Sequence, residues 1–293
     1  MAKFSGVYVA IITPFTEDYQ VDYKRLEEHV DWLITEGVHG IIPAGSVGEY
    51  ASLTAEERAK VVETVIGAVN GRVPVVVGTG APSTEQAAGW ARHAKAAGAA
   101  GIMALPPINY NPTEAEIFAH YEALSETAIP IIAYNNPHDY KVDLTPDLLK
   151  SLSAIDNVVA VKEFSGDVRR VHDILAKTDL EVLIGVDDLA MEGPIAGATG
   201  WIAGFPNVFP REGVRIFELA SQGRVKEALE VYRPSLPLYH YDAKPQLVQA
   251  IKYSMELAGR PVGPTRPPRM PLPESELQKI KGAFEQAATV KVN

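Results

Sequence analysis

The fold is decided by VPVVVGTG (73–80), AGIMALPP (100–107) and the helical stretch between them. Both apolar runs are nearly continuous rather than alternating, which is typical of strands that are covered on both faces of a parallel sheet. The stretch between them opens with Ser83 and Thr84, residue types that cap the N-terminus of a helix. The segment therefore predicts a unit of two parallel strands joined by a helix.

The same alternation continues along the chain in both directions. Helix start signals recur at Thr54 with Glu57, at Thr113 with Glu116, and at Thr145 before a proline. Six further apolar runs lie at 6–14, 40–45, 129–137, 157–164, 180–188 and 200–206. Eight units of a strand and a helix predict an α/β protein with the (β/α)8 TIM-barrel fold. A doubly wound sheet is the alternative, but it would carry a glycine-rich dinucleotide loop after its first strand, which here ends in Thr13-Pro14-Phe15.

Residues 223–293 contain no strand-like run. They predict helices at 225–233, 245–258 and 274–288, with the proline-rich segment RPVGPTRPPRMPLP (260–273) as a stiff surface connector. A ligand for a peptide-recognition domain is the alternative for this segment. We therefore expect a catalytic barrel at 1–222 and a C-terminal helical extension at 223–293 that packs on it.

Composition excludes several classes of function. The 293 residues carry a net charge of −10 and no cysteine, so there is no basic patch for nucleic acid or anionic lipid, no disulfide and no thiolate chemistry. The apolar run at 7–12 is too short for a signal-peptide core or a membrane span. We expect a cytoplasmic protein that binds a small molecule and neither nucleic acid nor membrane.

In a barrel the active site lies at the carboxyl ends of the strands, so the residues that close each run are the candidates. Lys162 interrupts the apolar run VVAVKEF, where burial would lower the pKa of its amine and favour Schiff-base formation with a carbonyl. A lysine that points from a strand end into solvent is the alternative.

Tyr134 closes the preceding strand, where its phenol could shuttle protons or form part of the rim. After the second strand, Gly45 and Ser46 begin GSVGE (45–49), a turn whose N–H groups can hold a carboxylate.

A metal site is not expected. Acidic residues do lie near strand ends, at Glu49, Glu163, Asp187 and Asp188, so a magnesium cluster is conceivable. The seven histidines are scattered, however, and form no HxxxH pair. We expect no catalytic metal and no organic cofactor.

Together these motifs resemble the dihydrodipicolinate synthase / N-acetylneuraminate lyase superfamily, whose members form a Schiff base with a lysine. The resemblance implies that Lys162 forms the imine, that Tyr134 shuttles protons, and that Ser46 contacts both this tyrosine and the substrate carboxylate beside the Val47 N–H. It also places Gly185 and Ile202 next to the lysine, and it implies a homotetramer built as a dimer of dimers. The motifs that carry it are GVYVAIITPF (6–15), GSVGE (45–49), SLTAEER (52–58), VPVVVGTG (73–80), YNNP (134–137), VKEFSGD (161–167) and GATGWIAGFPN (197–207).

Three departures from this pattern bear on the substrate. The synthases usually have a second hydroxyl residue where Val47 stands, a tyrosine pair where INYNP (108–112) stands, and an arginine where Asp139 stands. The arginine would hold the carboxylate of a second substrate, which Asp139 would repel, so we expect poor synthesis of dihydrodipicolinate. YNNP (134–137) resembles the 1-pyrroline-4-hydroxy-2-carboxylate deaminases of hydroxyproline degradation.

The sequence thus predicts a Schiff-base lyase that dehydrates and deaminates 1-pyrroline-4-hydroxy-2-carboxylate to 2,5-dioxopentanoate. Asn136, His138 or Asp139 would then face a hydroxyl or ring nitrogen of the substrate. The alternatives are 4-hydroxy-tetrahydrodipicolinate synthase or another pyruvate-dependent aldolase, a 2-keto-3-deoxy sugar acid dehydratase, and a non-catalytic sensor of small molecules.

Overall fold

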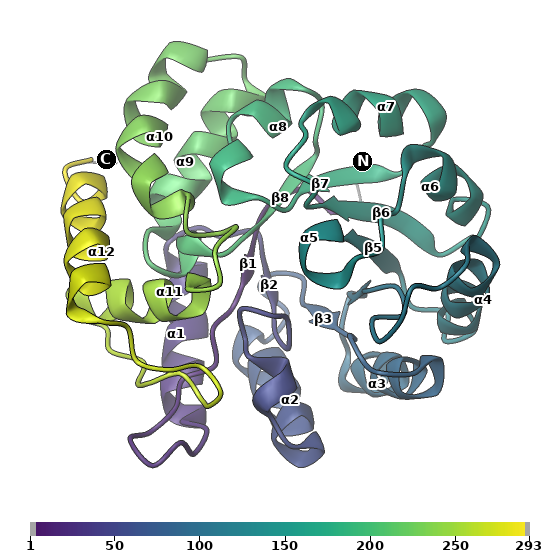
Figure 1. Cartoon of the computed structure of the whole chain (residues 1–293), viewed down its shortest axis with the longest axis horizontal. Helices are drawn as coiled ribbons and strands as arrows, with labels where there is room; N and C mark the ends of the chain where they lie inside the picture. The colour runs from purple at the N-terminus through teal and green to yellow at the C-terminus, as the bar shows by residue number, and fades with distance from the viewer. Residues whose placement is uncertain (1–3, 291–293) are drawn as a thin grey trace.

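The computed structural model describes residues 4–290 and contains an eight-stranded parallel barrel, as the sequence predicts. In Figure 1 the strands lie in the middle of the molecule and the helices lie around them. The strands are β1 (Gly6–Ala10), β2 (Gly40–Ile42), β3 (Val76–Gly78), β4 (Gly101–Ala104), β5 (Ile131–Asn135), β6 (Val158–Glu163), β7 (Glu181–Ile184) and β8 (Gly200–Ala203). Nearly every residue of these strands is buried, because side chains fill the barrel inside and helices cover it outside.

Neighbouring strands pair in the order β2-β1-β8-β7-β6-β5-β4-β3. A parallel bridge between Ile41 and Val75 joins the two ends of this order and closes the ring. The surrounding helices are α1 (Tyr23–Thr35), α2 (Ala55–Val69), α3 (Thr84–Ala97), α4 (Glu114–Ser125), α5 (Pro137–Tyr140), α6 (Pro146–Leu152), α7 (Arg169–Lys177), α8 (Glu192–Ile195) and α9 (Pro210–Ser221). Closure brings all eight carboxyl strand ends to one face.

The helix start signals read from the sequence are present as hydrogen bonds. Thr54 caps α2 and Thr113 caps α4, and in each case the glutamate three residues on returns the bond to the cap residue. Ser83 caps α3, and Thr145 caps α6 just before its first proline. Local sequence therefore sets where these helices begin.

The C-terminal extension consists of α10 (Val225–Tyr239), α11 (Leu247–Leu257) and α12 (Glu274–Ala287), and α12 packs along α10 at the outer edge of Figure 1. The predicted end of the first of these helices at residue 233 is wrong. α10 continues through Pro234 and Pro237, although each proline removes a helical N–H donor, because the final turns bury Leu238 and Tyr239 in the core. Tertiary packing here outweighs local propensity.

The proline-rich connector lies on the surface as predicted, but specific contacts fix it to the barrel. Arg266 donates hydrogen bonds to both carboxylate oxygens of Glu57 at 2.6 Å, and to the backbone oxygen of Ser52 at 2.8 Å. The backbone at Gly263 has φ +74°, and a Cβ there would lie 1.7 Å from the Phe15 carbonyl oxygen. The connector is therefore a structural clamp, and the division of the chain at residue 222 stays a prediction.

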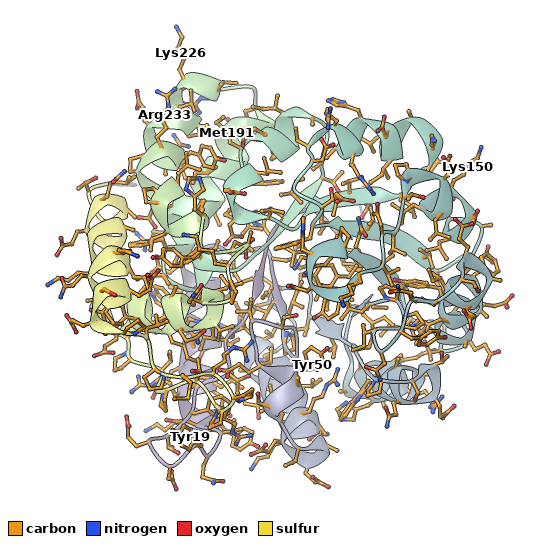
Figure 2. The ribbon with its side chains drawn as sticks, in the orientation of Figure 1. Tyr19, Tyr50, Lys150, Met191, Lys226 and Arg233 are labelled. Carbon is orange, nitrogen blue, oxygen red and sulfur yellow. The ribbon has the colours of Figure 1, made fainter. Side chains whose placement is uncertain are left out.

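Side chains in Figure 2 illustrate the difference between rim and interior. Lys150 and Lys226 project outward from the perimeter, whereas the half-buried Tyr50 lies inside the outline of the molecule beside α2. No helix among residues 4–290 is long and apolar enough to cross a membrane.

Candidate active site

Lys162 and Tyr134 are neighbours at the carboxyl ends of β6 and β5. The two residues are directly paired in the parallel register, so their side chains leave the strands on the same side. The Lys162 Nζ lies 4.3 Å from the centre of the Tyr134 ring, and the lysine is only 6% exposed. The alternative of a solvent-directed lysine is therefore wrong, because the strand register turns this side chain inward.

Burial lowers the pKa of Lys162 to about 8, because the charged ammonium loses its hydration. Three carboxyl groups act in the opposite direction, Asp242 most strongly, followed by Asp187 and Asp139. An amine with a pKa of about 8 is partly neutral near physiological pH, and the neutral form is the one that attacks a carbonyl.

Gly185 makes room for this lysine. A Cβ at position 185 would lie 2.8 Å from the Lys162 Cε and 3.0 Å from the Glu163 carbonyl oxygen, which is closer than real contacts allow. Ile202, the other residue expected beside the lysine, is fully buried on β8 and paired in register with Tyr8 of β1.

The phenol of Tyr134 is buried and accepts a hydrogen bond from the Asn136 side chain at 3.2 Å. Burial raises the pKa of Tyr134 well above its usual value, so the phenol stays protonated. Asn136 also caps the short helix α5, and its amide donates to the Asp139 carboxylate at 2.8 Å. One asparagine therefore fixes the phenol and positions Asp139.

The GSVGE loop presents a row of N–H groups. Ala44, which precedes the loop, and Glu49, its last residue, have left-handed backbone conformations with φ of 58° and 55°. Among residues 4–290, the N–H groups of Ser46, Val47 and Gly48 find no hydrogen-bond acceptor. This is the geometry of an anion-binding turn.

Glu49 holds the far end of this loop in place. Its carboxylate is fully buried, pairs with the Lys252 Nζ at 2.9 Å and accepts a hydrogen bond from the Arg266 N–H at 3.0 Å. Both partners belong to the C-terminal extension, so the extension supports the loop. Thr13 donates to the Gly48 carbonyl oxygen at 2.7 Å from the side of β1.

The expected contact between Ser46 and the Tyr134 hydroxyl is not present among the described residues. Ser46 instead shares a hydrogen bond of 2.9 Å with the hydroxyl of Tyr140, whose ring packs edge-on against Tyr134. The cause is α5, which follows β5 almost immediately and brings Tyr140 into contact with both Ser46 and the Tyr134 ring. No motif in the sequence singles out Tyr140.

A cavity of about 500 Å³ opens at this end of the barrel. Ser46, His138 and Asp139 line it, as does Phe164, whose ring lies 5.6 Å from the Lys162 Nζ. The rest of the wall comes from Tyr140 and from the C-terminal extension, which contributes Asp242, Ala243, Lys244, Pro245, Leu247, Val248 and Arg269. Gly45, Ser46 and Tyr134 line a smaller adjoining space of about 10 Å³. Of the residues chosen from the sequence, Ser46, His138 and Asp139 line the cavity and Gly45 and Tyr134 line the smaller space, whereas Lys162 packs behind them against the Tyr134 and Phe164 rings. The wall from the C-terminal extension is one that sequence reasoning missed.

The acidic residues near the strand ends are engaged in the protein's own hydrogen bonds. Both oxygens of Asp187 accept from the Gly204 N–H, and one or the other also accepts from the Phe205 N–H and the Trp201 ring. Glu163 accepts from the Asn135 side chain and the Ser165 N–H. Within residues 4–290 no group of three or more histidine, aspartate or glutamate side chains is arranged to hold a metal ion.

Comparison with known proteins agrees with this geometry. The dihydrodipicolinate synthetase family model matches residues 3–287. A 4-hydroxy-tetrahydrodipicolinate synthase from Methanothrix thermoacetophila is 36% identical over 282 residues, which cover 95% of each chain.

Two solved structures share the fold throughout. The chloride-inhibited dihydrodipicolinate synthase from Acinetobacter baumannii, complexed with pyruvate, is 31% identical with a TM-score of 0.92, covering 98% of this chain and 99% of its own. A monomeric dihydrodipicolinate synthase variant is 27% identical with a TM-score of 0.92, covering 99% and 98%. The chain therefore belongs to the dihydrodipicolinate synthetase family and is, like its relatives, a lyase.

Proposed function

We propose that Lys162 forms an imine with C2 of a 2-oxo acid. The observation that carries this proposal is a buried amine with a lowered pKa, packed on the Tyr134 ring beside a cavity. The substrate carboxylate binds the Ser46 hydroxyl and the free N–H groups of the GSVGE loop, which places C2 toward the lysine.

The protonated imine then acts as an electron sink. It acidifies C3, whose proton passes to Tyr134, and an enamine results. The Tyr134 phenol is already protonated, so it can take the C3 proton only by passing its own proton to a neighbouring acceptor in the same step. Among the described residues the Tyr134 hydroxyl is bonded to Asn136, so such a relay requires that substrate binding bring one of the hydroxyls of Ser46 and Tyr140, which lie 2.9 Å apart, within reach of it.

The names of the relatives support condensation of pyruvate with aspartate semialdehyde, the 4-hydroxy-tetrahydrodipicolinate synthase reaction, better than deamination. The enamine would attack the aldehyde, and the second carboxylate needs a cation. Asp139 cannot supply one, but Lys244 and Arg269 also line the cavity. This reaction is the first candidate.

Deamination of 1-pyrroline-4-hydroxy-2-carboxylate is the second candidate. It is favoured by Asp139 and Asp242 in the cavity wall, because this substrate brings a single carboxylate and the two acids do not repel the rest of it. The reaction consumes one water and releases 2,5-dioxopentanoate and ammonia.

Borohydride trapping tests the shared chemistry. Reduction in the presence of pyruvate should add mass to the peptide that contains Lys162, and Lys162→Ala should abolish the adduct. Lys150→Ala, on the exposed face of α6, is the matched control. An adduct that persists in Lys162→Ala would overturn the proposal.

A side-by-side assay then separates the candidates. Pyruvate with aspartate semialdehyde and the hydroxypyrroline are compared under the same conditions, with ammonia release as the readout for deamination. Tyr134→Phe should lower turnover on the accepted substrate by about 10²–10⁴, the usual contribution of a positioned acid–base group.

We also propose that the protein works in the cytoplasm as a homotetramer. The absence of cysteine fits a reducing compartment, and the tetramer rests on the family resemblance. Because one related structure is a monomeric variant, light scattering in solution is the deciding measurement.

A further inference from the structure

Asp242 stands out among the groups that line the cavity. It lies between α10 and α11, far from the strand ends in sequence, and is only 7% exposed. Its Oδ2 accepts a hydrogen bond from the Asp187 N–H at 2.8 Å, and within residues 4–290 its Oδ1 has no hydrogen-bond partner. One oxygen is thus anchored, and the other is left for a molecule in the cavity.

Asp242 also lies close enough to the reacting groups to influence both of them. Among charged side chains it acts most strongly on the ammonium of Lys162, and it also affects the phenol of Tyr134. Three charged groups face it within the protein: Asp187, Asp188 and Lys162. Asp139, Lys244 and Arg269 share the cavity wall with it.

Both candidate reactions need a proton at the same place. When the enamine attacks an aldehyde, the carbonyl oxygen becomes the hydroxyl on C4 of the product and must gain a proton. When a 4-hydroxy substrate is dehydrated, the oxygen on C4 must gain a proton to leave as water. Each step therefore needs a general acid beside C4.

We propose that Asp242 is this general acid and donates its proton to the oxygen on C4 of the imine-bound substrate. The inference rests on the proposed function, because it requires the Lys162 imine. In dehydration the nitrogen lone pair re-forms the C2=N bond, the C2=C3 electrons form C3=C4, the C4–O bond breaks, and the leaving oxygen takes the Asp242 proton. In the aldol reaction C3 bonds to the aldehyde carbon and the oxygen takes the same proton. Asp242 is left as a carboxylate in both cases.

The state of Asp242 suits this role. Burial and the neighbouring Asp187 raise the pKa of Asp242 well above its usual value, so the carboxyl keeps a proton that an exposed aspartate would have lost. Asp187 is not an equivalent candidate, because its oxygens already accept hydrogen bonds from two N–H groups and the Trp201 ring. Asp139 is exposed, and its carboxylate is held by Asn136.

The test separates imine formation from proton donation. The variants are Asp242→Asn, which keeps an acceptor for the Asp187 N–H, Asp242→Glu, which restores an acid, and Asp188→Asn, which removes a neighbouring charge. Each is assayed by borohydride trapping with pyruvate and by elimination from 4-hydroxy-2-oxobutanoate and 4-chloro-2-oxobutanoate. Chloride leaves without a proton, so it does not need the acid.

We expect Asp242→Asn to trap pyruvate like the wild type, to lose about 10²–10⁴ in water elimination, and to eliminate chloride within about threefold of the wild type. Asp242→Glu should recover part of the water elimination, and Asp188→Asn, which removes the weaker of the two acidic neighbours of Asp242, should lose far less than Asp242→Asn. Equal losses with both leaving groups, or a loss of trapping in Asp242→Asn, would show a structural role and overturn the inference. Unchanged water elimination would overturn it too. Failure of the wild type to trap pyruvate would instead refute the proposed function.

Discussion

Replacing Lys162 by methionine should stabilise the fold while it removes the proposed nucleophile. Burial lowers the pKa of Lys162 from 10.5 to about 8, so at pH 7 the folded protein holds an ammonium in surroundings that disfavour it. Each unit of pKa shift corresponds to about 1.4 kcal/mol, so this penalty is roughly 3 kcal/mol. Methionine has a similar length and no charge, and it avoids the penalty.

The lowered pKa of Lys162 also sets the direction and the pH range over which the stability difference between Lys162→Met and the wild type changes. Below pH 8 the lysine is protonated in both the folded and the unfolded chain, and the full penalty applies. Between pH 8 and 10.5 only the unfolded chain keeps the proton, so the wild type gains stability as the pH rises. The advantage of Lys162→Met should therefore shrink by about 2 kcal/mol between pH 7 and pH 9.5.

Urea unfolding of both proteins at the two pH values measures this difference, and titrating groups that do not interact with Lys162 cancel in the comparison. Lys150→Met, on the exposed perimeter in Figure 2, controls for the loss of one positive charge. An advantage that is absent at pH 7, or that does not change with pH, would show that Lys162 is not desolvated as described.

Three further outcomes follow from the geometry. Gly185→Ala should lower pyruvate trapping at least tenfold by displacing Lys162, as mass spectrometry would show, whereas Gly67→Ala, with open space at its Cβ, should trap normally. The rate of imine formation should rise as the pH approaches about 8 and level off above it, because the neutral amine is the nucleophile; a rate that is flat from pH 6 to 9 would contradict this. Lys252→Met should cost up to about 3–5 kcal/mol in urea unfolding, because the buried Glu49 then keeps only the more distant Arg269 guanidinium, at 3.6 Å, as a charge partner, and the double change with Glu49→Gln should cost less. Equal losses in the single and double variants would count against the pairing.

Local signals predicted most of the barrel. Thr54 and Thr113 cap the helices that the sequence assigned to them, and Lys162 stood out because it interrupts an apolar strand. These features depend on a few neighbouring residues or on strand periodicity, so a sequence shows them directly.

What the sequence could not show depends on contacts between distant segments. Tyr140 replaces Tyr134 as the partner of Ser46 because a four-residue helix turns it inward, and nothing in PHDY predicts that direction. Asp242 lies in a segment that the sequence presents as surface helices, and only the packing of α10 brings it to the cavity. In the same way, packing against the core keeps α10 helical beyond Pro234, where helix propensity alone would end it.

The contribution of the C-terminal extension to the cavity wall also has a consequence during protein synthesis. Chains are made from the N-terminus, so all eight strands, Lys162 and Tyr134 exist before residues 242–269 have been translated. A nascent barrel at that stage would expose its amine to cellular metabolites without the Asp242 carboxyl group, and the support of Glu49 by Lys252 would still be missing. The wall of the cavity is therefore completed last, when the extension docks on a barrel whose strands have all been made.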